Sequence, residues 1–378
     1  MTGTGTQDDP FIVDNWEDFK TATAYVNYGK YVKWADSENN ILKLEDNSSD
    51  SVSINSAQVD FNGWTFVINK HPYNLMLFRF PYGTAKNAQF IVDLIALNSG
   101  GVLLSVSDES TGNGIFTFER IYISVSVSDA TSNPFYCFYT GYGSGNGFII
   151  VNNSIISIAL DNDSPIELGM GDRAIYQNCE FLIKCSGKDK YGIYNFGKDS
   201  DLHGSNSSSF QLYNCYIGGH ISAATSEGVN FKINTDYINN TVINLSSSNI
   251  PEIEILGQSY GYPNIWVTNT SVSIRSDANI VYASPDEIKN EDFLKSTGIE
   301  YILDDNVRNP QFGDSTDESW TFRQNSKVNN GILFLPFWKY PVPSDEEFNV
   351  YIGGIQIKEI FYGSKPITAI YYGKQKIY

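Results

Sequence analysis

The sequence has few of the residues on which metal sites and nucleic-acid interfaces depend. Only three histidines and four cysteines occur among 378 residues, and no pair of cysteines has the spacing of a zinc site. We therefore expect neither a metal nor a cofactor. Lysine and arginine together number 25 against 43 acidic residues, which gives a net charge of −18. Because phosphate binding needs a basic surface, nucleic acid is not an expected partner.

Long apolar runs are also missing. No window approaches the ~20 apolar residues that a membrane-spanning helix needs, so no membrane span is expected. The first residues, MTGTGTQDDPF, contain neither the basic segment nor the apolar stretch of a signal peptide. We therefore expect synthesis in a cytoplasm without signal-directed export, which argues against a secreted adhesin.

Aromatic residues, in contrast, are abundant. They make up 14% of the chain, with 25 tyrosines and 23 phenylalanines, while charged residues make up only 18%. Tyrosine, asparagine, serine and glycine supply the polarity instead, a mixture that favours strands and turns. Short β-branched and aromatic runs follow one another between clusters of Gly, Asn, Asp and Ser, which predicts an all-β protein. Examples are residues 52–54, 64–68, 90–94, 121–127, 148–151 and 181–183.

A repeated pair of residues suggests how these strands are arranged. An asparagine followed by a small residue precedes a short strand five times, at steps of 25, 36, 26 and 29 residues. One strand signature per period of this length predicts a solenoid, here a right-handed parallel β-helix. The asparagine would adopt a left-handed turn and the small residue would point inward. A β-sandwich remains the alternative, although it requires no such pair. The pairs are Asn153-Ser154, Asn178-Cys179, Asn214-Cys215, Asn240-Thr241 and Asn269-Thr270.

A solenoid needs its end coils covered, and two predicted helices stand where such caps belong. The first is expected to begin at the N-cap Asn15 and to end at Gly29. Its acidic first turn contains Glu17 and Asp18, and its expected buried face contains Trp16, Phe19 and Val26.

The second helix is expected to begin at Ser284 and to end at Gly298. Pro285 at the first helical position and Glu287 three residues after Ser284 form a capping-box pattern. Its expected apolar side consists of Ile288, Phe293 and Leu294.

The C-terminal tail repeats every ten residues. The sequences YIG, FYG and YYG begin at positions 351, 361 and 371, and an isoleucine follows at the same place in each unit. Each unit predicts a strand, a glycine-containing turn and a second short strand. Three such units cannot bury a large core, so we expect them to dock on another surface, although a simple terminal cap of the β-helix is the alternative. The candidate docking residues are Tyr351, Tyr362, Tyr372, Ile357, Ile367 and Ile377.

These observations divide the chain into four parts. Residues 1–30 are an N-terminal segment with a capping helix, and residues 31–283 are the β-helix. Residues 284–340 hold the second helix and a closing segment. Residues 341–378 are a linker and the decapeptide-repeat module.

Several segments resemble β-helix proteins of bacteria and phages. The opening GTGTQDDPFIVDNWEDF resembles their first segment, and PDEIKNEDFLKSTGIEY resembles their closing helix. The stretch NNGILFLPFW is similar to a frequent ending, with Ile332 and Phe334 in place of its usual tyrosines. The decapeptide repeat is similar to a C-terminal module of tailed-phage virion proteins.

This resemblance implies a phage virion protein: a fibre, spike or head-decoration appendage located in the virion. Its implied partners are other virion proteins, and the implied oligomer is a homotrimer. A bacterial surface glycan is an implied ligand. Aromatic side chains are suited to contact a glycan or a partner, although alternation would turn half of them towards the core. The candidates are Tyr136, Tyr139, Tyr142, Tyr260 and Tyr262.

The alternative function is a tailspike-like polysaccharide depolymerase, because parallel β-helices include lyases and hydrolases. Such chemistry needs paired carboxylates or an acidic calcium site. The acids within or beside predicted strands are expected to be solvated outward residues, so no catalytic residue is assigned. The sequence Gly218-Gly219-His220 has only a superficial likeness to the histidine motif of polygalacturonase-like hydrolases. The acids considered are Asp60, Asp93, Glu119 and Glu180.

Overall fold

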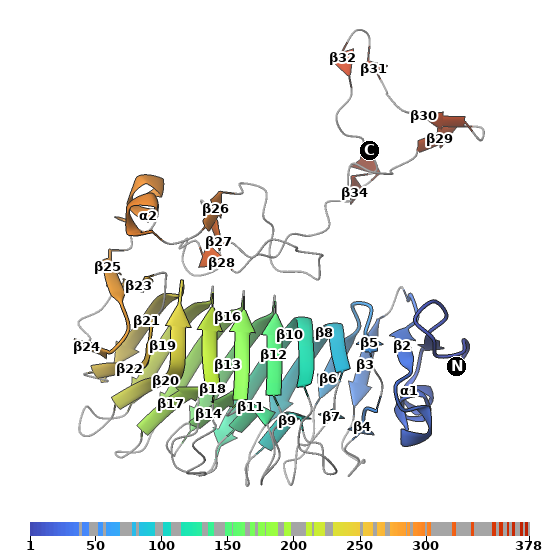
Figure 1. Ribbon diagram of the computed structural model, residues 1–378, viewed down its shortest axis with the longest axis horizontal. Helices are drawn as coiled ribbons and strands as arrows, with labels where there is room; N and C mark the ends of the chain where they lie inside the picture. Colours follow the sequence, from blue (N-terminus) through green and yellow to red (C-terminus); the bar gives the residue numbers. More distant parts are fainter. Residues whose placement is uncertain are drawn as a thin grey trace.

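In the computed structural model the chain forms a rod of stacked β-coils (Figure 1). The structure describes residues 1–37, 40–44, 52–55, 58–68, 78–80, 83–94, 101–106, 115–130, 135–139, 148–152, 154–162, 167–170, 173–177, 179–187, 193–197, 209–213, 215–223, 230–249, 252–259, 263–268, 273–284, 286–287, 290–298 and 301–303, together with short strands between 320 and 376.

The strands of the rod pair in parallel and form three faces, here named A, B and C. Each coil contributes one strand to each face in turn. Face A contains β1 (Phe11–Val13), β2 (Tyr31–Trp34), β5 (Gln58–Asp60), the first parts of β8 (Gly83–Leu94) and β10 (Ile115–Ala130), β12 (Phe148–Asn152), β15 (Arg173–Gln177), β18 (Ser209–Tyr213) and the end of β20 (Asn230–Asn239).

The other two faces follow the same order along the rod. Face B contains β3 (Ile41–Leu44), β6 (Thr65–Ile68), the second parts of β8 and β10, β13 (Ile155–Asn162), β16 (Glu180–Gly187), β19 (Tyr216–Ala223), β21 (Val242–Ser248), β23 (Asn264–Val267) and β25 (Ile280–Ala283). Face C contains β4 (Val52–Ser53), β7 (Phe78–Phe80), β9 (Gly101–Val106), β11 (Phe135–Tyr139), β14 (Glu167–Met170), β17 (Ile193–Gly197), the start of β20, β22 (Glu252–Gln258) and β24 (Ser273–Ser276). This arrangement confirms the parallel β-helix and excludes the antiparallel β-sandwich.

The tight corner between faces A and B explains the asparagine-small pairs. Asn240 has a φ of 50° at this corner, and the preceding coils place Asn62, Asn87 and Arg120 there with φ values of 51°, 59° and 54°. Asparagine tolerates this left-handed backbone better than most residues. The corner asparagines 153, 178 and 214 lie outside the described residues.

The small residue after each corner points inward and hydrogen-bonds. Ser154, Cys179, Cys215 and Thr241 are all buried. Each donates its hydroxyl or thiol proton to the carbonyl oxygen two residues earlier, with donor–acceptor distances of 2.7, 3.3, 3.2 and 3.1 Å, respectively. An apolar side chain here would leave that carbonyl group without this partner, so the position favours Ser, Thr or Cys over Ala.

The fifth predicted pair is not equivalent to the other four. Asn269 and Thr270 lie outside the described residues, but the strand that comes after them, β24, pairs with β22 on face C. The face B strand of that coil is β23, which starts at Asn264. The Asn264 side chain reinforces this corner, because its Oδ1 accepts from the Thr241 amide at 3.0 Å and its Nδ2 donates to the Ile238 carbonyl at 3.0 Å. In this coil an asparagine therefore occupies the position that Thr241 has in the preceding coil, five residues before the predicted Asn269.

Helix α1 (Trp16–Thr23) closes the N-terminal end of the rod. Asn15 caps it as predicted, because its side chain accepts from the Asp18 amide at 2.9 Å. Phe19 is buried against Trp34, with ring centroids 5.3 Å apart. The prediction was wrong for Val26, which is 85% exposed, and for Gly29 as the helix end. The helix ends at Thr23 because Ala24 adopts an extended ψ of 157°, and the short η1 (Tyr25–Asn27) comes next.

Helix α2 (Glu291–Thr297) begins later than predicted. The capping box of Ser284 and Glu287 forms, with the Ser284 amide donating to the Glu287 carboxylate at 2.8 Å, but it closes only a single turn. Asn290 is the real N-cap, since its side chain accepts from the Asp292 amide at 2.9 Å. Gly298 ends the helix in the left-handed conformation, as predicted. Ile288 lies outside the described residues.

The chain after α2 contains only short sheets among its described residues. The strands β26 (Tyr301–Leu303), β27 (Trp320–Phe322) and β28 (Phe334–Leu335) form one of them. Three two-stranded antiparallel sheets come after it, at residues 350–376. No helix within the described ranges is long and apolar enough to cross a membrane.

Candidate functional sites

The C-terminal repeats form three hairpins, here called the hairpin module. Their strands are β29 (Val350–Ile352) with β30 (Ile355–Ile357), β31 (Phe361–Tyr362) with β32 (Lys365–Pro366), and β33 (Tyr371–Tyr372) with β34 (Gln375–Lys376). Two residues separate the strands in each hairpin, and the first of the two is always glycine. This confirms the two predicted strands of each unit, and the residues between them lie outside the described residues.

The structure places four of the six candidate docking residues. Tyr351 pairs with Gln356 in the first hairpin, Tyr362 with Lys365 in the second, and Tyr372 with Gln375 in the third. Ile357 ends β30, opposite Val350. Ile367 and Ile377 lie outside the described residues.

The structure places two of the five aromatic contact candidates. Tyr136 and Tyr139 lie in β11 of face C, whereas the prediction had them in a loop. Phe138, in the same strand, is buried. Tyr142, Tyr260 and Tyr262 lie outside the described residues.

The acids that could have formed a catalytic pair lie apart. Asp60 and Glu119 belong to the same row of face A, but Lys86 stands between them in the register. Lys86 contacts the Asp60 carboxylate of the preceding coil at 3.6 Å, and Arg120 contacts its chain neighbour Glu119 at 2.9 Å. Both acids therefore have a basic partner, which for Asp60 comes from the next coil. The side chain of Asp93 is not described.

Glu180 contradicts the expectation of a solvated outward acid. It is completely buried at the start of β16, and the register places Tyr216 beside it on the next coil. Tyr216 is also buried, and its hydroxyl accepts from Asn244 Nδ2 at 2.9 Å. Burial raises the pKa of Tyr216, and the charge of Glu180 raises it further. Gly218 leaves room for the Tyr216 ring, which a Cβ at that position would overlap.

A polar row that the sequence analysis passed over lies on the outside of face B. His220 is exposed, and the register places Lys184 on one side of it and Ser246 on the other. The His220 ring contacts Ser246 Oγ through Nδ1 at 2.7 Å and Ser248 Oγ through Nε2 at 3.3 Å. In the sequence, the serines are 26 and 28 residues from the histidine, so only the coil register could have revealed the group.

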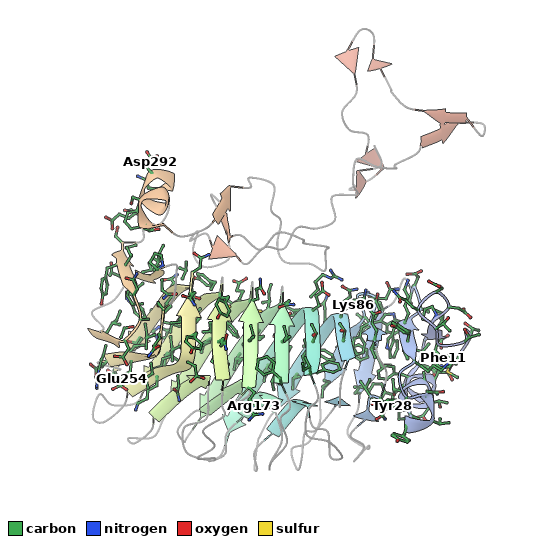
Figure 2. All side chains as sticks on the ribbon, viewed as in Figure 1. Phe11, Tyr28, Lys86, Arg173, Glu254 and Asp292 are labelled. Atoms are coloured by element: carbon green, nitrogen blue, oxygen red, sulfur yellow. The ribbon has the colours of Figure 1, made fainter. Side chains whose placement is uncertain are left out.

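The N-terminal end carries an exposed apolar group that the sequence also did not reveal. Tyr25, Val26 and Tyr28 are 77%, 85% and 57% exposed, and the two tyrosine rings are 5.8 Å apart. Tyr28 lies at the tip of the rod beside α1 (Figure 2). Exposed aromatic residues of this kind are suited to act as anchors for a partner.

The described cysteines have a structural role. Cys179 and Cys215 are buried free thiols at successive corners, as the repeat predicted. Burial raises the pKa of Cys179 well above its ordinary value, and Cys215 nearby raises it further. A thiol with a raised pKa is a poor nucleophile. Among the described residues no three His, Cys, Asp or Glu side chains are grouped as metal ligands.

Comparison with known proteins gives no relative. The chain matches no protein-family profile, no curated protein and no solved structure.

Proposed function

We propose that the chain is a structural subunit of a larger assembly, in which the β-helix is a rigid rod and the hairpin module joins copies of the chain. The observation that carries this proposal is the form of the module. Its three hairpins are separate two-stranded sheets, and no described residue adds a third strand to any of them.

Isolated hairpins of this size need a further surface to be stable. A single two-stranded hairpin is at best marginally stable in water. The first strand of each hairpin is nevertheless apolar and aromatic, and the first hairpin pairs Val350 with Ile357 and Ile352 with Ile355. Burial of such residues against equivalent hairpins would supply the missing layer, and identical modules on identical chains are always available for it.

Charge supports the module as the contact segment. Residues 350–378 contain four lysines and one glutamate, a net charge of +3. Since the whole chain has −18, the remaining residues carry −18 − 3 = −21. The rest of the chain carries a large charge of one sign, so copies of it repel one another strongly, whereas the small charge of the module opposes contact between modules far less. The module is therefore better suited than the rod to begin association.

The segment resemblances support a phage virion as the assembly. In that setting the subunit would be an appendage such as a fibre, spike or head decoration, trimeric as in similar appendages. Other virion proteins would be its neighbours, and a host-surface glycan its external ligand. The rod of stacked coils suits an appendage of this kind (Figure 1).

Sedimentation of a full-length variant tests the proposal. The variant combines Tyr351→Ser, Tyr362→Ser and Tyr372→Ser, and the control combines Tyr25→Ser with Tyr28→Ser at the other end of the chain. We expect the first variant to sediment as a monomer and the control to keep the oligomer of the unaltered protein. An unchanged oligomer in the first variant would refute the module as the self-association site.

A further inference from the structure

The His220 group has the connectivity of a nucleophile with its base. Ser246 Oγ lies 3.1 Å from the carbonyl oxygen of Gly219 and donates its only proton there. The contact between Ser246 Oγ and His220 Nδ1, at 2.7 Å, must therefore be donated by the imidazole. In the neutral ring Nε2 is then the acceptor, and the Ser248 hydroxyl donates to it at 3.3 Å. A serine hydroxyl hydrogen-bonded to a basic nitrogen, with a third group orienting the base, is the arrangement of activated serines.

The backbone beside both residues is unusual. Gly219, directly before His220, has a φ of 134°, and a Cβ at this position would overlap the backbone of Ile183. Its register neighbours on face B, Ile183 and Leu245, are ordinary buried core residues. Asn249, directly after Ser248, has a φ of 61°. A glycine inside a strand often marks a site where another group approaches the backbone closely.

The surroundings hold the group rigidly and leave it open to solvent. His220 and Ser248 are exposed, so a substrate can reach both. The strands β19 and β21 that carry them are paired over seven residues. Farther back along the same side of these two strands, the buried contact of Tyr216 with Asn244 also joins them. Sites on such paired strands are more precise than sites on loops.

We propose that Ser248 and His220 form a nucleophile–base pair that hydrolyses small carboxylic esters. Ser248 Oγ bonds to the ester carbonyl carbon while its proton moves to His220 Nε2. The tetrahedral intermediate then breaks its bond to the alcohol oxygen, which takes the proton from His220. Water attacks the acyl-serine in the same way, which releases the carboxylic acid and restores Ser248.

Two neighbouring residues have supporting roles. Ser246 is a positioning residue, because it accepts from Nδ1 and so keeps Nε2 free of its proton. Lys184 occupies the adjacent position of the row, where a cation favours a developing oxyanion. An ester suits the group better than a glycoside, since glycoside cleavage uses two carboxylates, whereas the register positions directly beside His220 and Ser248 are Lys184, Ser246 and Ser222.

Labelling and hydrolysis with the full-length protein test the proposal. The probes are a biotinylated fluorophosphonate, located by peptide mass spectrometry, and p-nitrophenyl acetate. We expect one label per chain, on Ser248, and its loss in Ser248→Ala. His220→Gln should lower ester hydrolysis by about 100-fold or more. Ser157→Ala, which alters another outward serine of face B, is the matched control and should leave both readouts unchanged.

The positioning role of Ser246 has its own readout. Ser246→Ala should lower hydrolysis by roughly tenfold through loss of ring orientation, and Ser246→Thr, which keeps the hydroxyl, should restore it. Circular dichroism checks that each variant is folded. Failure of the unaltered protein to label or hydrolyse, or equal rates in folded Ser248→Ala, would overturn the proposal and leave the group a structural polar row.

Discussion

The two ends of the β-helix are finished differently. At the N-terminal end, α1 covers the first coil and buries Phe19, and the free edge of β1 is occupied by an antiparallel bridge between Thr2 and Ile12. At the C-terminal end, β24 and β25 each pair with a strand on one side only among the described residues. The core residues there, Ile274 and Ile280, are only partly buried.

The difference shows which end of the rod is stabilised by its own neighbouring segment. An uncovered end of a solenoid exposes strand edges and core to water. The N-terminal end is closed by the first 30 residues, which precede the coils they cover (Figure 1). Within the described structure the C-terminal end has no comparable cap, since Phe293 of α2 is itself only half-buried. Stability should therefore be concentrated at the N-terminal end.

Removal of the N-terminal cap contact should have the largest effect. Phe19→Ala deletes a completely buried ring that contacts Trp34 and Phe61, and should lower the free energy of unfolding by about 3–5 kcal/mol. Phe293→Ala at the other end should cost less than about 1 kcal/mol, because large losses need a buried side chain. Urea denaturation of both variants measures the difference, and equal losses would remove the contrast between the ends.

A substitution in the middle of the rod should have an intermediate effect. Gly219→Ala forces a Cβ onto a left-handed backbone against Ile183, so we expect a loss of roughly 1–3 kcal/mol. Gly298→Ala, also at positive φ but with open space around it, is the control and should cost less. Thermal unfolding compares the stability of the two variants. If Gly219→Ala causes no loss of stability, the strand can adjust to a Cβ at this position without cost.

Substitutions of the two helix N-cap residues should have smaller effects on stability. Asn15→Ala removes the acceptor for the Asp18 amide and should destabilise the protein by about 1 kcal/mol. Asn290→Ala makes the same change in α2, which does not cover the core, so the main unfolding transition should not move. A shift of that transition by Asn290→Ala would show that α2 contributes to the stability of the rod.

The smallest expected effect concerns Glu287. The Ser284 amide and hydroxyl donate to its carboxylate at 2.8 and 2.7 Å and hold its pKa below the ordinary value. Because this pKa is lowered in the folded protein, the ionised Glu287 stabilises the folded state. This contribution is complete at a pH above the pKa of the unfolded chain, about 4.3, and is lost as the pH falls through the pKa of the folded protein. An NMR titration should give the lowered pKa, and Ser284→Ala should raise it. No change in this variant would contradict the capping box.

The sequence predicts the local features that one short motif determines. Asn15 marks the start of α1, and Asn240-Thr241 marks a corner, because one residue's backbone preference or hydrogen bond decides each. The prediction fails where two local signals compete. The capping box at Ser284 was the stronger pattern, yet Asn290 begins the helix, and Asn264 replaces Asn269 at its corner.

The candidate sites likewise include features that the sequence predicts and features that it does not. The hairpins follow from a strict ten-residue period, so their form was predictable. The group of His220, Ser246 and Ser248 was not, because coil lengths vary and the register between β19 and β21 sets which side chains meet. The burial of Glu180 was not predicted, because alternation along a strand shows that a side chain points outward but not that other residues cover it.

The most direct measurement is the mass of two proteins by light scattering: the full chain and a version that ends at Glu347. We expect an oligomer for the full chain and a monomer for the shortened one, with unchanged circular dichroism of the rod. If both proteins are monomers, or both form the same oligomer, the hairpin module does not join copies of the chain.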